Sequence, residues 1–390
     1  MNFARSALAT VVSVCAAILL LVGPASAESG ELPPPRATEV KAEVEELTGA
    51  VCPAVAARDI VCVRTREVPV TYGTGRDEPG AAAPLSAGEV APQRYPSYCT
   101  KEQNWVVRRF GACAKNLLSM WVHVEIDSKG KSKIVGTVST MTNNYYSTTK
   151  ILTVTHSWTT WISVAGTGTY SHYPLRMTTK DRMCGSLTTG KFNLSPSKSV
   201  VKEKVATCNV PNSTAAKPTF NYEFLVHPKG TTATIPQKWS APTIRCDRAT
   251  YLQFKYACVF SGYRPTWQVD IDDDKGAKTA GHIRSAMNSL EDHWGKQGVG
   301  SPLSRYHYTG SGTNPNRKVA CAGFKKKDSS DSCDEYPMAS TYQGAYFVGK
   351  SRTSVAHVPL TDNSYNGNLL NDFYRNNRIL DGDEFWVKVS

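Results

Sequence analysis

Beyond its first 27 residues, this chain of 390 residues contains no apolar run as long as the ~18 residues that a membrane-spanning helix needs. It also contains no GxSxG, HExxH or P-loop sequence, so the usual signatures of serine hydrolases, zinc proteases and nucleoside triphosphatases are absent. Acidic residues are outnumbered by basic ones, and the formal net charge is +12. These absences argue against a membrane-inserted protein and against several common enzyme classes.

The first 27 residues have the form of a secretory signal peptide. Arg5 is their only charge, an apolar run extends from Ala7 to Val22, and Ala25, Ser26 and Ala27 give a small-residue cleavage pattern. We therefore expect a soluble protein that is secreted to the extracellular space, begins near Glu28 and does not insert into a membrane.

The cysteines indicate disulfide bonds. Removal of the signal peptide removes Cys15 and leaves ten of the eleven cysteines, an even number that is typical of disulfides in an exported chain. None of the neighbouring pairs has the CxxC spacing that structural zinc sites usually supply. Successive near neighbours predict five local disulfides: Cys52 with Cys62, Cys99 with Cys113, Cys184 with Cys208, Cys246 with Cys258, and Cys321 with Cys333.

The charge of the mature chain indicates an anionic partner. Without the signal peptide, 44 basic and 33 acidic residues remain, a balance of +11. Such a protein can meet nucleic acid, an anionic cell-wall polymer or a membrane surface, and the charge alone does not choose among them.

Length and composition divide the mature chain into three parts, because its length exceeds that of one ordinary core. Residues 28–95 are predicted to be an irregular linker or propeptide, with a short helix only between Val40 and Val63. Residues 96–240 are predicted to be a β-rich accessory domain, and residues 241–390 a compact α+β domain. The predicted fold class is therefore an α+β C-terminal domain preceded by an all-β, sandwich-like domain.

The β-rich prediction rests on alternation with a period of two. The segments "MWVHVEID", "KIVGTVSTM" and "ILTVTHSWTTWISV" each have this pattern and follow one another closely, as strands of an antiparallel sandwich or barrel do. No group of catalytic residue types occurs here. This region is interpreted as a binding or spacer module whose partner is left open.

The C-terminal region mixes helical and strand patterns. Apolar residues at helical spacing in "TAGHIRSAMNSLEDHWGKQG" predict a helix with Thr279 as N-cap, His282 in the first turn and Gly298 as the stop. A second helix is predicted in "GNLLNDFYRNN". The chain ends in "DGDEFWVKVS", which predicts a half-buried strand after an Asp381-Gly382 turn.

Asp334 and Glu335 are the strongest candidates for chemistry. They are adjacent in "DSSDSCDEYPMAS" and are held between Cys333 and Pro337. Carboxylates on a rigid segment are the ligands that Mg²⁺ and Mn²⁺ prefer, and a divalent cation is what phosphodiester hydrolysis requires. The alternative is an acidic surface turn. His282 is the best candidate for a general base because an ordinary histidine pKa of about 6.5 is close to working pH, although a surface histidine is the simpler interpretation.

Basic residues occur beside these candidates. Arg317 and Lys318 lie in "NPNRKVACAG", and residues 325–327 form a lysine run inside the predicted Cys321–Cys333 loop. A charge run is usually a solvated face, but next to a carboxylate site it can hold a nucleic-acid backbone.

Five segments in the C-terminal region together resemble the secreted bacterial NucA/NucB deoxyribonucleases: "KTAGHIRSAM", "NRKVACAGF", "DSCDEYPMASTYQGA", "DNSYNGN" and "RILDGDEFWV". The resemblance implies a metal-dependent endonuclease with little sequence specificity, with Asp334 and Glu335 in its active site. It also implies that His282, Arg317 and Asn363 are active-site or substrate-contacting residues. Two departures are present: Gln343 stands where related sequences often have Glu, and Cys333 stands where short members have Arg.

The working hypothesis is a secreted nuclease that hydrolyses DNA, with RNA left open as a second substrate. Asp334 and Glu335 would hold Mg²⁺ or Mn²⁺, and either His282 or Glu335 would activate water. The predicted substrate contacts are Arg317, Lys318, Asn363 and Gln343.

Two alternatives are kept. One is a catalytically silent basic module that binds cell-wall polymer, nucleic acid or a protein partner, and the Gln343 departure is what favours it. The other is that the N-terminal region restrains activity until the chain is processed.

Overall fold

A computed structural model gives the structure of the chain for part of its length. It describes residues 50–51, 54–56, 59–64, 69–72, 96–101, 103–126, 132–148, 153–166, 170–179, 187–188, 192–193, 198–207, 220–228, 235–240, 242–252 and 256–390. The predicted signal peptide lies outside these residues. Among the described helices, none has both the length and the apolar character needed to cross a membrane.

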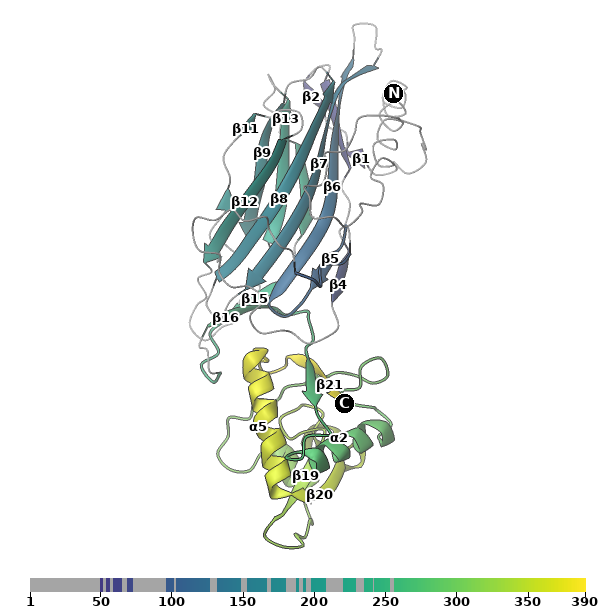
Figure 1. Cartoon of the computed structure of the whole chain (residues 1–390), viewed down its shortest axis with the longest axis vertical. Helices are drawn as coiled ribbons and strands as arrows, with labels where there is room; N and C mark the ends of the chain where they lie inside the picture. The colour runs from purple at the N-terminus through teal and green to yellow at the C-terminus, as the bar shows by residue number, and fades with distance from the viewer. Residues whose placement is uncertain are drawn as a thin grey trace.

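The N-terminal half consists of two sheets (Figure 1). The larger has the order β1-β3-β6-β7-β8-β12, with β2 paired to β3 and with β5 paired to both β4 and β6. The smaller has the order β10-β9-β13-β14, with β11 also paired to β9. The strands of the larger sheet are β1 (Ala50–Val51), β2 (Ala54–Ala56), β3 (Asp59–Arg64), β4 (Val70–Tyr72), β5 (Trp105–Val107), β6 (Gly111–Ile126), β7 (Ser132–Thr148), β8 (Thr153–Gly166) and β12 (Lys198–Thr207). Those of the smaller are β9 (Tyr170–Thr179), β10 (Leu187–Thr188), β11 (Phe192–Asn193), β13 (Phe220–Pro228) and β14 (Ile235–Ser240).

The three segments with a period of two are strands, as predicted. They lie in β6, β7 and β8, which pair as antiparallel neighbours in the centre of the larger sheet. The register places Trp121 opposite Val138 and Met141 opposite Trp161. The sandwich-like packing of the two sheets stays a prediction.

The structure differs from the expectation of an irregular segment at residues 28–95. Strands β1 to β4 lie in this interval and join the larger sheet, where β3 pairs with β6 from Asp59 opposite Glu125 to Val63 opposite Trp121. The short helix expected between Val40 and Val63 is wrong for the described part, which is extended. The physical reason is the sequence "DIVCVR", whose β-branched residues favour a strand once a partner strand is available.

Three of the predicted disulfides are confirmed. Bonds join Cys99 to Cys113, Cys246 to Cys258, and Cys321 to Cys333. The second of these bridges directly opposed residues of the hairpin β15 (Ile244–Asp247) and β16 (Ala257–Phe260). The other two predicted pairs include Cys52, Cys184 and Cys208, which lie outside the described residues.

The C-terminal region has the α+β composition that was predicted. Strands β17 (Thr266–Val269), β21 (Glu384–Val389) and β18 (Leu303–Ser304) form one small sheet, in which β17 and β21 are parallel. Strands β19 (Asp331–Tyr336) and β20 (Ser354–Pro359) form a separate antiparallel pair. The helices are α2 (Ala277–Ser289), α3 (Pro315–Ala320), α4 (Ala345–Val348), the 3₁₀ turn η2 (Lys350–Arg352) and α5 (Leu360–Asn376). One core joins α2 and α5 to the small sheet, with Ile283 of α2, Phe373 and Tyr374 of α5, and Phe385 of β21 all buried.

Both predicted helices exist, but their ends differ from the prediction. Helix α2 begins after Gly276 and ends at Ser289, so neither Thr279 as N-cap nor Gly298 as the stop is correct. Asp362 of α5 accepts a hydrogen bond from the backbone N–H of Lys278. This N–H belongs to the first turn of α2 and has no acceptor within the helix. The partner of this helix terminus therefore comes from a distant part of the chain.

Arg109 joins the β-rich half to the C-terminal region. It lies in the turn between β5 and β6, is 1% exposed, and donates hydrogen bonds to the backbone oxygens of Tyr263, Asn377 and Arg378. Its guanidinium also pairs with Asp383 at 2.8 Å. A loop of the larger sheet is therefore fixed to the end of α5 and the turn before β21.

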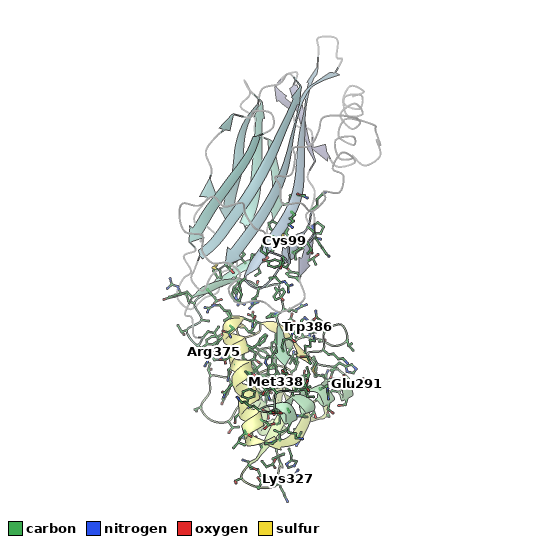
Figure 2. All side chains as sticks on the ribbon, in the orientation of Figure 1. Cys99, Glu291, Lys327, Met338, Arg375 and Trp386 are labelled. Carbon is green, nitrogen blue, oxygen red and sulfur yellow. A yellow bond between two sulfur atoms is a disulfide. The ribbon has the colours of Figure 1, made fainter. Side chains whose placement is uncertain are left out.

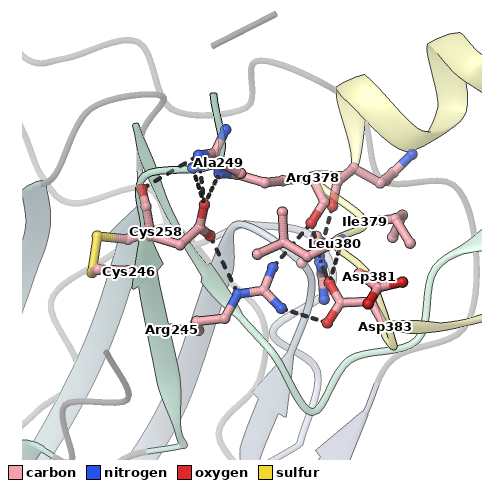
Figure 3. Close-up of polar contacts among 12 residues, drawn as sticks. Arg245, Cys246, Ala249, Cys258, Arg378, Ile379, Leu380, Asp381 and Asp383 are labelled. Atoms are coloured by element: carbon pink, nitrogen blue, oxygen red, sulfur yellow. Dashed lines mark hydrogen bonds and ion pairs between the residues drawn. A yellow bond between two sulfur atoms is a disulfide. The ribbon is translucent and has the colours of Figure 1, made fainter. Parts of the chain in front are cut away.

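Further charged residues complete this contact, shown in Figure 3. Arg245 of β15 pairs with Asp383 and Asp247, and Arg378 pairs with Asp247 at 2.6 Å. Burial raises the pKa of Asp383, and the guanidinium groups of Arg109 and Arg245 lower it. Together the two cations outweigh burial, so the pKa of Asp383 lies below its usual value. We call the five residues Arg109, Arg245, Asp247, Arg378 and Asp383 the interdomain cluster. In Figure 1, β19 and β20 lie toward the opposite end of the α+β region.

Candidate active site

Asp334 and Glu335 lie side by side in strand β19. The whole strand is buried, although its sequence "DSCDEY" is polar. Register pairs Asp334 with Ala356 and Glu335 with Val355 of β20. Because successive side chains of a strand point to opposite faces of the sheet, the two carboxylates project in different directions. Each therefore has its own partner.

Asp334 pairs with His282 of helix α2. Nδ1 of His282 lies 2.6 Å from Oδ2 of Asp334, and Nε2 lies 2.9 Å from the hydroxyl oxygen of Ser354. Because a carboxylate only accepts, Nδ1 carries a proton, and in the neutral ring Nε2 accepts from the serine hydroxyl. His282 is 9% exposed, and both of its nitrogens are engaged. It was predicted in the first turn of the helix, with a surface position as the simpler interpretation; it lies in the second turn, on the buried side of α2.

Glu335 pairs with Arg317 of helix α3. NH1 of Arg317 lies 3.1 Å from each carboxylate oxygen of Glu335, and NH2 donates to the backbone oxygen of Cys333 at 2.8 Å. The side chain of Glu335 is 8% exposed, whereas that of Arg317 is 39% exposed. The arrangement is a buried carboxyl group covered by a half-exposed guanidinium.

Burial changes the protonation of Glu335. Desolvation raises the pKa of this carboxyl group to about 7, and the guanidinium of Arg317 opposes the rise. The nearby Asp334 carboxylate adds to it by repulsion. A carboxyl group with a pKa near 7 can exchange a proton at neutral pH, as a general acid or base must.

The Cys321–Cys333 disulfide fixes this pair of elements. Cys321 is the C-cap of α3, and Cys333 precedes Asp334 in β19, so the bond holds Arg317 beside Glu335. The sulfur of Cys321 lies 3.8 Å from Oε2 of Glu335. Cys321, Cys333 and Glu335 form a compact group of metal-ligand types, but the two sulfurs are bonded to each other and supply no thiolate. Of this group, the carboxylate of Glu335 remains as a ligand for a hard cation.

The other predicted site residues lie at different distances from this centre. Asn363, in the first turn of α5, donates from Nδ2 to the hydroxyl of Ser332 and to the backbone oxygen of Cys333. Lys318 is exposed on α3, next to Arg317. Gln343 accepts a hydrogen bond from the backbone N–H of Ser304 through its amide oxygen. The structure therefore places Asn363 against β19 and Gln343 against β18.

Sequence reasoning missed several residues around the acidic pair. Ser354 contacts His282, and His357 of β20 pairs with Asp331 at 2.6 Å and lies 4.2 Å from the ring of Phe324. A cross-strand argument would have found Ser354 and His357, had β19 and β20 been recognised as strands. The polar sequence of β19 has no apolar alternation, so this signal was absent.

The predicted lysine run lies in the loop between α3 and β19. Lys325, Lys326 and Lys327 are all exposed. Figure 2 shows Lys327 at the end of the α+β region that lies away from Cys99. The backbone N–H of Lys327 donates to Asp331, which ties this loop to the first residue of β19. The positive charges are therefore attached to the strand that carries the acidic pair.

Comparison with known proteins gives a family match for the C-terminal region. Residues 302–388 match the family model described as Deoxyribonuclease NucA/NucB. The match extends from β18 into β21 and contains four of the five segments that carried the resemblance, while the segment with His282 precedes it. No curated protein matches the chain.

Proposed function

We propose that this chain, whose C-terminal region belongs to the NucA/NucB deoxyribonuclease family, is a secreted endonuclease that hydrolyses phosphodiester bonds of DNA with little sequence specificity. The observation that carries the proposal is the buried Glu335, with its pKa raised to about 7, covered by the half-exposed guanidinium of Arg317. This pair combines a proton acceptor with an anion-binding group.

Glu335 is the better candidate for the general base. The sequence left His282 and Glu335 as alternatives. Both nitrogens of His282 and both oxygens of Glu335 are bonded to protein groups, so what favours Glu335 is its pKa, raised to about 7, beside an anion-binding guanidinium. Ionised Glu335 would take a proton from the attacking water, whose oxygen bonds to phosphorus as the ester P–O bond breaks. His282 would instead act as a positioning residue that holds Asp334.

The chain supplies suitable ligands for Mg²⁺ or Mn²⁺. Both ions prefer carboxylate oxygens, and Mg²⁺ is usually held by one or two carboxylates together with water and substrate phosphate. Oδ2 of Asp334 pairs with His282, so its Oδ1 would supply one ligand oxygen; Glu335, which projects in a different direction and pairs with Arg317, would be a ligand only where it does not act as the base. When bound, such a cation would polarise a phosphoryl oxygen and stabilise the charge that develops on it.

Substrate binding would rest on the backbone phosphates. Arg317 and Lys318 on α3 and the lysines of residues 325–327 are the nearby cations, and Asn363 would orient the substrate or a ligand. Phosphate contacts carry no base information, so little sequence preference should result. RNA stays open as a second substrate because these contacts do not depend on the sugar.

Secretion is part of the proposal. The three disulfides of the described residues and the signal-like first 27 residues support an extracellular protein. The predicted division into a signal peptide, a segment at 28–95, a β-rich domain at 96–240 and a nuclease domain at 241–390 is kept, with one qualification from the structure: β1 to β4 extend the β-rich sheet into the second part.

The alternative of a silent binding module drew its support from Gln343. Its amide oxygen accepts from the backbone of Ser304, and a glutamate carboxylate could accept the same bond. Gln343 therefore holds the loop after β19 against β18, and its presence gives no separate support for a silent domain.

The proposal is tested by nicking of supercoiled plasmid DNA by the oxidised chain in Mg²⁺, Mn²⁺ or EDTA. We expect metal-dependent nicking that Glu335→Gln abolishes and that Glu384→Gln, a control at an exposed carboxyl group of β21, leaves intact. DNA retention without nicking under every metal would instead support the silent-module alternative.

A further inference from the structure

We propose that an aromatic cluster beside the active site is a base-stacking subsite for single-stranded DNA. The cluster, called here the aromatic platform, consists of Tyr306, Tyr342, Tyr346 and Phe347. This inference rests on the proposed nuclease function and adds to it a preferred form of the substrate.

The rings of the platform contact one another closely. The centroids of Tyr306 and Phe347 lie 5.0 Å apart in an edge-to-face arrangement, and those of Tyr342 and Phe347 lie 5.1 Å apart. Tyr346 meets Phe347 edge-to-face at 5.2 Å. Tyr346 is nevertheless 59% exposed and Phe347 is 42% exposed. The two outer rings are thus held by aromatic neighbours while much of their surface faces solvent, which is unusual for large apolar groups clustered together.

The backbone that carries the platform is fixed by a buried asparagine. Asn316 donates from Nδ2 to the backbone oxygens of Ala339 and Thr341, and its Oδ1 accepts from the backbone N–H of Tyr346. Gly344 is required here because a Cβ atom would lie 2.3 Å from Cγ of Asn316. The exposed rings therefore project from a segment that is already ordered, so binding would not have to order it.

The platform is continuous with the candidate active site through helix α3. Asn316, which orders Tyr346, is followed by Arg317, which contacts both carboxylate oxygens of Glu335. A nucleotide strand whose phosphate is held at Arg317 would place its neighbouring bases near this side of α3. The hydroxyl of Tyr342 donates to Asp381, which fixes that ring.

The surrounding charges favour a nucleic-acid strand as the occupant. Lys318 of α3 and Lys350 of η2 are exposed, and Nζ of Lys350 donates to the backbone oxygen of Ala322 just after α3. Cations for the phosphates together with exposed aromatic faces for the bases are the combination that binds single strands without sequence preference. In a duplex the base faces are already stacked on one another, so the platform would discriminate in favour of unpaired DNA.

The test is equilibrium binding of two fluorescein-labelled probes, a short oligothymidylate and a blunt duplex, to the full chain in EDTA. We expect Phe347→Ala and Tyr346→Ala each to weaken oligothymidylate binding at least about fivefold, the factor that corresponds to one lost base stack. Duplex binding should change by less than about twofold, since it depends on phosphate contacts. Phe347→Trp should retain single-strand binding, and Tyr72→Ala, an exposed aromatic of β4, is the matched control.

Three results would overturn the inference. One is unchanged oligothymidylate binding by both alanine variants, and another is an equal loss for the single strand and the duplex. The third is a dimer of the wild-type chain in sedimentation velocity that Phe347→Ala converts to monomer without affecting DNA binding, which would make the platform a protein contact. Because Tyr346 is 59% exposed, Tyr346→Ala should unfold at the same urea concentration as the wild type. Phe347 packs against three rings, so Phe347→Ala is compared with Phe347→Trp, which keeps a ring at that position.

Plasmid nicking separates this inference from the proposed function. If the alanine variants bind oligothymidylate normally and nicking persists, the stacking subsite is contradicted and the proposed nuclease function is supported. If binding of oligothymidylate depends on the platform but the wild-type chain does not nick DNA, the proposed nuclease function is contradicted and the stacking subsite is supported.

Discussion

Replacement of Glu335 by Gln should change how the stability of this protein depends on pH. Burial raises the pKa of Glu335 from 4.5 to about 7 in the folded chain, so between these values the folded state binds more protons than the unfolded state. The free energy of unfolding should therefore fall as pH rises through this window. At 1.36 kcal/mol per pKa unit, the loss attributable to Glu335 is about 3 kcal/mol.

The assay is urea unfolding in EDTA from pH 4 to pH 8 for the wild type and for Glu335→Gln. Gln does not titrate, so the stability of the variant minus that of the wild type should increase by about 3 kcal/mol across the range. Glu384→Gln reports the effect of removing an exposed carboxyl group. A difference between wild type and Glu335→Gln that stays constant with pH would refute the assignment of a raised pKa to the buried carboxyl.

Three further predictions concern the interdomain cluster and the surroundings of the site. Arg109→Ala should lower the free energy of unfolding by about 3–5 kcal/mol, because it leaves Asp383 with one cation fewer in a buried network, and urea unfolding should then show two separate transitions. Joint replacement of Cys321 and Cys333 by Ser should reduce the nicking rate at temperatures where circular dichroism shows the chain to be folded, because the disulfide holds α3 against β19; an unchanged rate would remove its positioning role. His282→Phe should destabilise the fold by at least about 1–3 kcal/mol in thermal or urea unfolding, since it leaves a buried carboxylate without its partner; a smaller loss would show that Asp334 does not depend on this histidine.

Local patterns in the sequence predicted a substantial part of this fold. The period-two segments identified β6, β7 and β8, and helical spacing identified α2 and α5, because both signals depend on residues a few positions apart. Near-neighbour spacing also predicted the three disulfides of the described residues. These features are determined within short stretches of chain.

The features that sequence patterns missed depend on distant partners. Helix α2 begins before Thr279 because Asp362, a residue of α5, accepts from its first turn. Strand β3 pairs with β6, about sixty residues later in the chain, so its strand character has no local turn signal. Arg109 follows Arg108 in a turn, and nothing in the local sequence distinguishes this buried arginine from a solvated one.

The sequence predicted which residues form the candidate site, but it did not predict how they pair. Asp334, Glu335, His282, Arg317 and Asn363 all lie on or against β19, which the resemblance and the residue types implied. Their pairing was not predicted, because it follows from the alternation of side chains along a strand whose polar sequence gives no strand pattern. That alternation directs Asp334 to His282 and Glu335 to Arg317.

The central claim is that Glu335 acts as the general base of a nuclease, and the most direct measurement is the single-turnover rate of plasmid nicking as a function of pH. We predict a rate that rises with pH to a plateau, with an apparent pKa at or below about 7, since a bound cation can only lower the pKa of this carboxyl. For Glu335→Gln we predict a rate at least about a hundredfold lower that has lost this dependence. Nicking by Glu335→Gln at the wild-type rate, with the same rise, would contradict the account.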